Sequence, residues 1–71
     1  MAAKLSDNAI EMVRYLGFST DVASLSDDEA CDLEMKAGDL DVYLAYENVP
    51  TDDPRVKALT EIFNFLAYEM P

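Results

Sequence analysis

The chain contains no element that could hold a small fold together covalently or through a metal. Its 71 residues include one cysteine and no histidine, so an internal disulfide and a Cys/His zinc site are both excluded. A domain of this size buries only about 60% of the surface that its unfolded chain exposes. We therefore expect a single domain over residues 1–71, stabilised by apolar packing and by oligomerisation or a partner.

Three positions carry the signals of a helix start. Ser6 can accept hydrogen bonds from the free N–H groups of a first turn. Ser26 and Glu29 have the spacing of a capping box, and Asp53 precedes a proline at what would be a first helical position. The sequence therefore predicts an all-α fold, with a short first helix and two longer helices packed as a hairpin. The helices are expected over residues 7–16, 27–47 and 54–69.

Glycine and proline mark the expected helix ends and one irregular point. Gly17 supplies a left-handed residue after the first helix, with Phe18 placed to fold back on Val13. The Ser-, Thr- and Asp-rich stretch that follows is expected to be a connecting loop, and Pro50 ends the second helix. Gly38 lies inside that helix at a cost of about 1 kcal/mol relative to alanine. We interpret Gly38 as a point of close packing, with a local weak point as the alternative.

The helix predicted over 27–47 has apolar residues on two opposite faces. One stripe follows alternating steps of three and four residues, which keeps its side chains on one face toward a core. When residues are placed about 100° apart, a second stripe of Met35, Val42 and Tyr46, with Cys31 nearby, lies roughly opposite the first. The stripe expected to face the core consists of Ala30, Leu33, Ala37, Leu40 and Leu44.

The helix predicted over 54–69 is apolar over about half of its circumference. One face carries Val56, Leu59, Phe63, Leu66 and Met70. Further apolar residues, Ala58, Ile62 and Phe65, widen this face. The shared core predicted from both long helices consists of Leu33, Leu40, Leu44, Leu59, Phe63 and Leu66.

Three short helices are not expected to cover this much apolar surface. Large exposed apolar patches on soluble proteins mark contact surfaces. We therefore predict that the second stripes lie against another subunit or a partner; the alternative is that the first helix and the loop cover them. The predicted contact residues are Met35, Val42, Tyr46, Ile62 and Phe65.

The net charge of −10 is concentrated in the middle of the chain. Between Asp21 and Asp53 there are eleven acidic residues and the single base Lys36. Such a field repels nucleic-acid phosphates and anionic lipid, so we expect neither direct nucleic-acid binding nor membrane binding. A basic protein partner, or a surface along which DNA passes without adhering, remains open. The charged residues in the first twenty also argue against a signal peptide.

No residue pattern in the chain indicates catalysis, a metal or a cofactor. The acidic run that begins at Asp27 lacks the spacing and turn glycine of a calcium loop. Cys31 has no basic neighbour within a turn to activate it. Arg55 and Lys57 occupy the first turn of the third helix, where the dipole disfavours cations. We expect an acidic surface to compensate them, on the second helix or across a subunit boundary, and we expect the protein not to be an enzyme.

Several stretches of the chain resemble one known family. The stretches are MVRYLGFS, SDDEACDLEMKAGDLDVYL and NVPTDDPRVKALTEIFNFLAYEMP. Their Leu-Gly turn, their Tyr-Leu near the end of the second helix and their proline- and acid-containing link resemble the head–tail connector (head-completion) family of tailed bacteriophages and prophages. The matching positions are Leu16-Gly17, Ala37, Tyr43-Leu44, Pro50, Asp52-Asp53-Pro54 and Tyr68-Glu69.

The resemblance implies a ring-forming adaptor located in the virion or the bacterial host cytoplasm. Many copies of such a protein assemble beneath the portal, complete the DNA-filled head and receive the tail. Its partners would be other copies of itself and the phage portal and tail proteins.

Two other classes of protein remain open from the residues alone. A small acidic phage-encoded inhibitor could imitate DNA charge and bind a basic host protein, with carboxylates standing in for phosphates. A helical interaction module with an unidentified partner is the third possibility. In the inhibitor, the phosphate surrogates would be Asp27, Asp28, Asp32, Asp39 and Asp41.

Overall fold

The computed structural model describes residues 5–68, and these residues form four helical segments and no strand. The all-α prediction is confirmed, and the predicted starts of the long helices are met. The first two helices end one residue earlier than predicted, and the predicted end of the third, residue 69, lies outside the described residues, as does Met70. The segments are α1 (Asp7–Tyr15), the 3₁₀ turn η1 (Val22–Ser24), α2 (Asp27–Tyr46) and α3 (Pro54–Tyr68).

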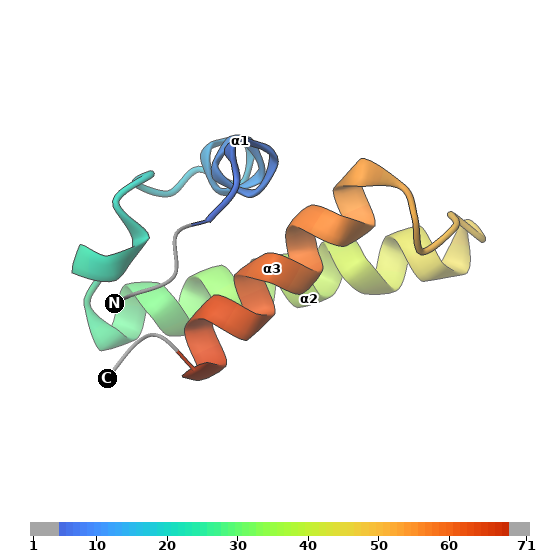
Figure 1. The fold of residues 1–71 in the computed structure, drawn as a ribbon. Coiled ribbons are helices and arrows are strands. Elements are labelled where there is room, and N and C mark those ends of the chain that lie inside the picture. The colour runs from blue at the N-terminus through green and yellow to red at the C-terminus, as the bar shows by residue number, and fades with distance from the viewer. Residues whose placement is uncertain (1–4, 69–71) are drawn as a thin grey trace.

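The two long helices form the predicted hairpin. In Figure 1, α2 and α3 run antiparallel beside each other, and α1 is seen almost end-on because it crosses them. Of the two long helices, α1 packs mainly on α3. The radius of gyration is 11.5 Å, and a globular chain of this length is expected to have about 11 Å. The hairpin and the short first helix together are therefore as compact as a globular domain.

All three predicted N-terminal caps are present. The hydroxyl of Ser6 accepts a hydrogen bond from the backbone N–H of Ala9 at 3.2 Å. Ser26 and Glu29 form both bonds of the capping box, at 3.0 and 3.2 Å. A carboxylate oxygen of Asp53 accepts from a backbone N–H in the first turn of α3 at 2.8 Å. The caps satisfy donors that a helix start otherwise leaves unpaired.

The first two helices end in the same hydrogen-bond pattern, each through a left-handed residue. After α1, Gly17 has φ +91°, as predicted, and the N–H of Phe18 donates to the carbonyl of Val13 at 3.2 Å. After α2, Asn48 has φ +60°, and the N–H of Val49 donates to the carbonyl of Leu44 at 3.0 Å. This is the Schellman motif, in which asparagine can replace glycine. Asn48, rather than Pro50, therefore ends α2.

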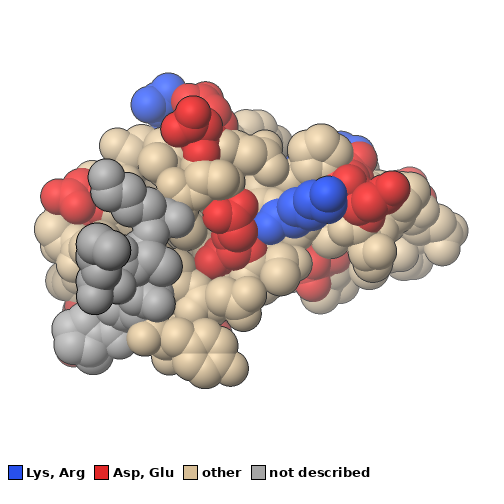
Figure 2. All heavy atoms as spheres, viewed as in Figure 1, with Lys and Arg blue, Asp and Glu red and all other residues tan. Residues whose placement is uncertain are grey.

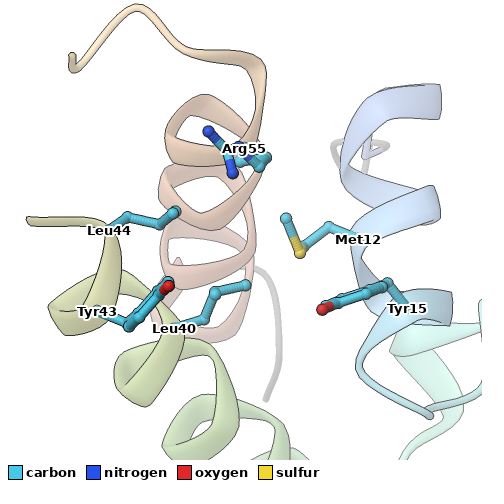
Figure 3. A pocket seen from close by; sticks show the side chains of 6 residues that line it. All are labelled: Met12, Tyr15, Leu40, Tyr43, Leu44 and Arg55. Carbon is cyan, nitrogen blue, oxygen red and sulfur yellow. The ribbon is translucent and has the colours of Figure 1, made fainter. Parts of the chain in front are cut away.

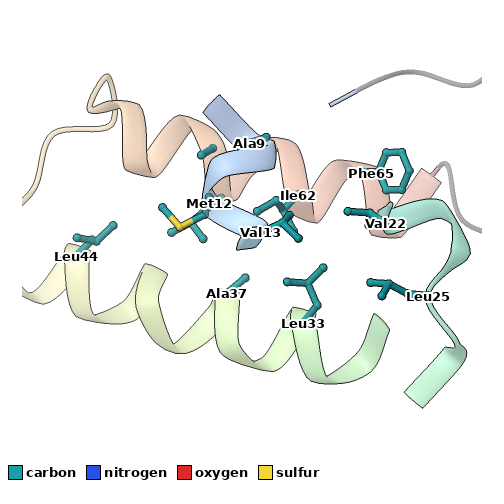
Figure 4. Packing of buried hydrophobic residues seen from close by; sticks show 12 residues of the cluster. Ala9, Met12, Val13, Val22, Leu25, Leu33, Ala37, Leu44, Ile62 and Phe65 are labelled. Atoms are coloured by element: carbon teal, nitrogen blue, oxygen red, sulfur yellow. The ribbon is translucent and has the colours of Figure 1, made fainter. Parts of the chain in front are cut away.

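The core lies where α1 crosses the hairpin and continues under the loop. Figure 4 shows Val13 of α1 beside Ile62 of α3, and the loop residues Val22 and Leu25 near Phe65. The loop before α2 was expected only to connect two helices, but it covers one end of the core. The buried residues are Ala9, Met12, Val13, Val22, Leu25, Leu33, Ala37, Leu44, Ala58, Leu59, Ile62 and Phe65.

Ile62 and Phe65 of α3 were predicted to lie on a surface that contacts another subunit or a partner, and this prediction is wrong. Ile62 is 0% exposed and Phe65 is 8% exposed, because α1 and the loop cover the face of α3 that carries them. Conversely, three residues predicted in the core are only partly buried and pack at its edge: Leu40, Phe63 and Leu66. The alternative left open by the sequence, that helix one and the loop wrap over the second stripe, is thus what occurs on α3.

Polar contacts between α1 and α3 fix where α1 crosses. The carboxylate of Glu61 accepts hydrogen bonds from the backbone N–H and the hydroxyl of Ser6, at 3.1 and 2.6 Å. The side-chain amide of Asn8 donates to the carbonyl of Pro54 at 2.7 Å. All three bonds join residues far apart in sequence, so they orient α1 over α3 in addition to the apolar packing beneath.

The capping box makes stability depend on pH in the acid range. The hydrogen bonds from the Ser26 backbone N–H and hydroxyl hold the pKa of Glu29 below its ordinary value of 4.5. A carboxyl whose folded-state pKa is lowered contributes stability above its unfolded pKa and loses that contribution as the pH falls through the folded pKa. Urea unfolding measures the free energy of unfolding of the natural chain and of Glu29→Gln. The natural chain should be the more stable at about pH 6, and this difference should shrink as the pH falls to about 3. A constant difference would contradict the capping role of the charged carboxylate.

Candidate functional site

One face of α2 carries a row of apolar residues that no other described part of the chain covers. Met35, Val42 and Tyr46 are 63%, 69% and 83% exposed, as the sequence led us to expect. They lie opposite the side of α2 that carries the buried Leu33 and Leu44. Smaller residues complete the row at alternating steps of four and three. We call this set the outer stripe: Cys31, Met35, Gly38, Val42, Ala45 and Tyr46.

The outward face of α3 has the opposite character. Its exposed residues include Lys57, Thr60 and Asn64, all of them polar. Apart from Tyr68, the large apolar residues of α3 face α1, α2 and the loop instead. Tyr68, at the end of α3, is 81% exposed, whereas the other large apolar residues of α3 are covered within the chain. The outer stripe of α2 has no cover among the described residues.

Acidic side chains border the outer stripe on both sides. At 3.6 residues per turn, six of the seven acidic residues of α2 lie within about a quarter of a turn of the stripe's centre. Lys36, the single base of α2, lies more than about a third of a turn away. The predicted interaction residues Asp39 and Asp41 therefore border the stripe that contains the predicted Met35, Val42 and Tyr46. The six bordering acids are Asp27, Asp28, Asp32, Glu34, Asp39 and Asp41.

Gly38 lies within the outer stripe and faces open space. A Cβ placed on it would have no atom within 4 Å. The interpretation of Gly38 as a point of close packing is therefore wrong within the chain itself. An interior helix position occupied by glycine without any steric need weakens the helix.

Replacing Gly38 by alanine should consequently stabilise the isolated chain. The added methyl group meets nothing, and alanine is favoured over glycine by about 1 kcal/mol in a helix interior. For a domain of this size that corresponds to a rise of about 4 to 8 °C in the midpoint of thermal unfolding. Circular dichroism during heating measures this midpoint. Gly17→Ala serves as the control and should lower the midpoint, because φ +91° at Gly17 strains any side chain. A lower midpoint for Gly38→Ala would show that the backbone there needs glycine.

A second surface feature is a hollow of about 230 Å³ between the end of α1 and the hairpin. In Figure 3 the Tyr15 ring extends from α1 toward Leu40 of α2, with Met12 above it. Its walls are mostly apolar and its polar groups are two phenols and a guanidinium, so it offers no nucleophile paired with a base. Its lining residues are Met12, Tyr15, Leu40, Tyr43, Leu44 and Arg55.

Arg55 and Lys57, predicted to pair with α2 or with another subunit, behave differently from each other. The guanidinium of Arg55 donates two hydrogen bonds to the carboxylate of Asp53, at 3.0 and 3.1 Å. These bonds lower the pKa of Asp53 and raise that of Arg55. The compensating acid is thus the cap of the same helix, so the predicted partner of Arg55 is wrong. Lys57 is exposed and makes no ion pair within the described part of the chain.

Basic side chains visible on the face in Figure 2 lie beside acidic ones. Arg14 pairs with Glu11 at 2.8 Å on α1. Such exposed pairs contribute little to stability, but they locally neutralise Arg14 and Arg55. Six of the acidic residues outside these pairs form the acidic border of α2.

Over residues 5–68, no three or more Cys, Asp or Glu side chains are grouped so as to hold a metal ion. None of the described helices combines the length and apolar character needed to cross a bilayer.

Comparison with known proteins gives no match to a family model, to a curated protein or to a solved structure.

Proposed function

We propose that this chain is a non-catalytic adaptor that contacts another protein through the outer stripe of α2. The observation that carries the proposal is the difference between the two long helices. The polar outward face of α3 includes Lys57, Thr60 and Asn64, whereas α2 exposes Met35, Val42 and Tyr46 in a row. Exposed apolar rows of this kind are typical of contact surfaces, and contact with a partner adds the burial that so short a chain lacks.

The sequence resemblance gives the proposal its most specific form, a head–tail connector of a tailed phage. In that role many copies assemble on the portal, complete the DNA-filled head and join the tail. The protein is made in the bacterial host cytoplasm and becomes part of the virion. A strongly acidic surface suits a channel through which DNA must pass without adhering.

Phage particles carrying Met35→Glu and Val42→Glu test this role. The substitutions place charges on the outer stripe, so DNA-filled heads that leak or do not accept tails should accumulate. A matched control, Thr60→Glu with Asn64→Glu, adds the same two charges to the polar face of α3 and should give normal particles. Normal infectious particles from the first variant, with the protein folded, would overturn the proposal.

The acidic border of α2 favours one second candidate, a small inhibitor that binds a basic host protein. In that case the carboxylates carry the interaction and the apolar row is incidental. Asp39→Lys with Asp41→Lys would then abolish binding of the basic protein, whereas Met35→Glu with Val42→Glu would leave it intact. The adaptor role predicts that the apolar substitutions have the larger effect.

A further inference from the structure

Resting on the proposed adaptor function, we infer that the outer stripe of α2 binds an amphipathic α-helix of another protein, one whose apolar row is bordered by lysine or arginine. The inference commits to the shape and the charge of the partner at this site. Two properties of the stripe support it: the spacing of its small and large residues, and the sign of the charges beside it.

The spacing suits a helix rather than a flat surface. Cys31, Gly38 and Ala45 are small and lie seven residues apart, and the larger Met35 and Val42 lie between them. A seven-residue repeat of this kind keeps one face of a helix against a partner helix. Small residues let two helix backbones approach closely, as seen most clearly in helix pairs within membranes. The open space at Gly38 is therefore room for an incoming helix.

The charges exclude a second copy of α2 as the occupant. Pairing two α2 stripes would bring six bordering acids of one copy close to the same six of the other, with Lys36 turned away from both. Like charges placed opposite one another disfavour a complex. A partner with basic borders instead meets opposite charge along both sides of its apolar row.

The other basic residues of the described chain do not supply such a helix. Arg14 and Arg55 already pair with acids on or beside their own helices. Lys57 lies on the polar face of α3, away from any exposed apolar row. The basic helix therefore belongs to a different protein.

Two synthetic helical peptides provide the probe. Each has about three heptads, with leucine and alanine in the apolar row; one has lysine at the bordering positions and the other has glutamate. We expect fluorescence anisotropy at low salt to show that the lysine peptide binds at least about tenfold more tightly than the glutamate peptide. Binding should weaken as salt is added, because the bordering charges are exposed.

Variants of the full chain separate docking from general attraction between opposite charges. Met35→Glu with Val42→Glu makes the chain more acidic, so simple attraction would strengthen binding of the lysine peptide, whereas docking on the stripe predicts a loss of at least about tenfold. Thr60→Glu with Asn64→Glu should bind as the natural chain does. Gly38→Leu should remain folded, because no described atom lies within 4 Å of a Cβ at that position and leucine is a good helix former. It should also bind at least about tenfold more weakly.

Three results would overturn the inference: equal binding of both peptides, no binding of either, or unchanged binding by Gly38→Leu. Each is distinguishable from failure of the adaptor role. If only the inference fails, Met35→Glu with Val42→Glu still blocks assembly of phage particles. If the adaptor role fails, those particles form normally.

Discussion

Replacing Ile62 by alanine is expected to lower the free energy of unfolding by about 2 to 5 kcal/mol. The side chain is 0% exposed and lies beside Val13, where α1 crosses the hairpin (Figure 4). Shortening it removes apolar contacts and leaves a cavity that the packed helices only partly fill. Native domains have a free energy of unfolding of about 0.05 to 0.15 kcal/mol per residue, which gives roughly 4 to 10 kcal/mol for a chain of this length. A large part of the population should therefore unfold under mild conditions.

Urea unfolding followed by circular dichroism measures this loss, and the outer stripe provides its control. Val42 is 69% exposed, so Val42→Ala should change the free energy of unfolding by no more than about 0.5 kcal/mol. Leu40→Ala should fall between the two variants, because Leu40 is only partly buried and lines the open hollow. Similar losses for Ile62→Ala and Val42→Ala would contradict the position of α1 over α3.

The second large effect is expected for binding rather than for folding. Met35→Glu with Val42→Glu should abolish binding of the partner while preserving the helical content of the chain. Both side chains are more than half exposed, so glutamate remains hydrated at either site. The added negative charges and lost apolar contacts should lower the free energy of unfolding by less than about 1 kcal/mol.

Two controls accompany this variant in circular dichroism and native-mass measurements. Leu33→Glu, on the opposite face of α2, places a charge at a fully buried site and should unfold the chain. Thr60→Glu with Asn64→Glu should preserve both folding and binding. Unfolding of the Met35/Val42 variant would mean that the outer stripe is part of the core.

The helix boundaries could be predicted because their causes are local. Ser26 with Glu29 and Asp53 with the following proline act within one turn, and both caps form. The end of α2 at Asn48 was missed because Pro50, two residues later, is the stronger stop signal in the sequence. Asparagine is, however, the residue that most often replaces glycine in this position, and this signal could have located it.

The faces of α3 could not be assigned from the sequence because that choice is made by tertiary contacts. α3 is apolar over a wide arc, and either side could have faced outward. The contacts of Ser6 with Glu61 and of Asn8 with the start of α3 set the crossing of α1, which buries Ile62. No periodicity within α3 contains this information. On α2, by contrast, two narrow stripes lie on opposite faces, so one of them had to remain exposed once the hairpin formed.

Photo-cross-linking from position 42 tests the central claim most directly. A photoreactive amino acid replaces Val42 in the outer stripe, and in a matched chain it replaces Asn64 on the polar face of α3. Both sites are exposed, so neither replacement should disturb the fold. If the outer stripe is the contact surface, irradiation during assembly should yield a covalent adduct with another protein from position 42 and none from position 64. An adduct from position 64 alone, with none from position 42, would contradict the account.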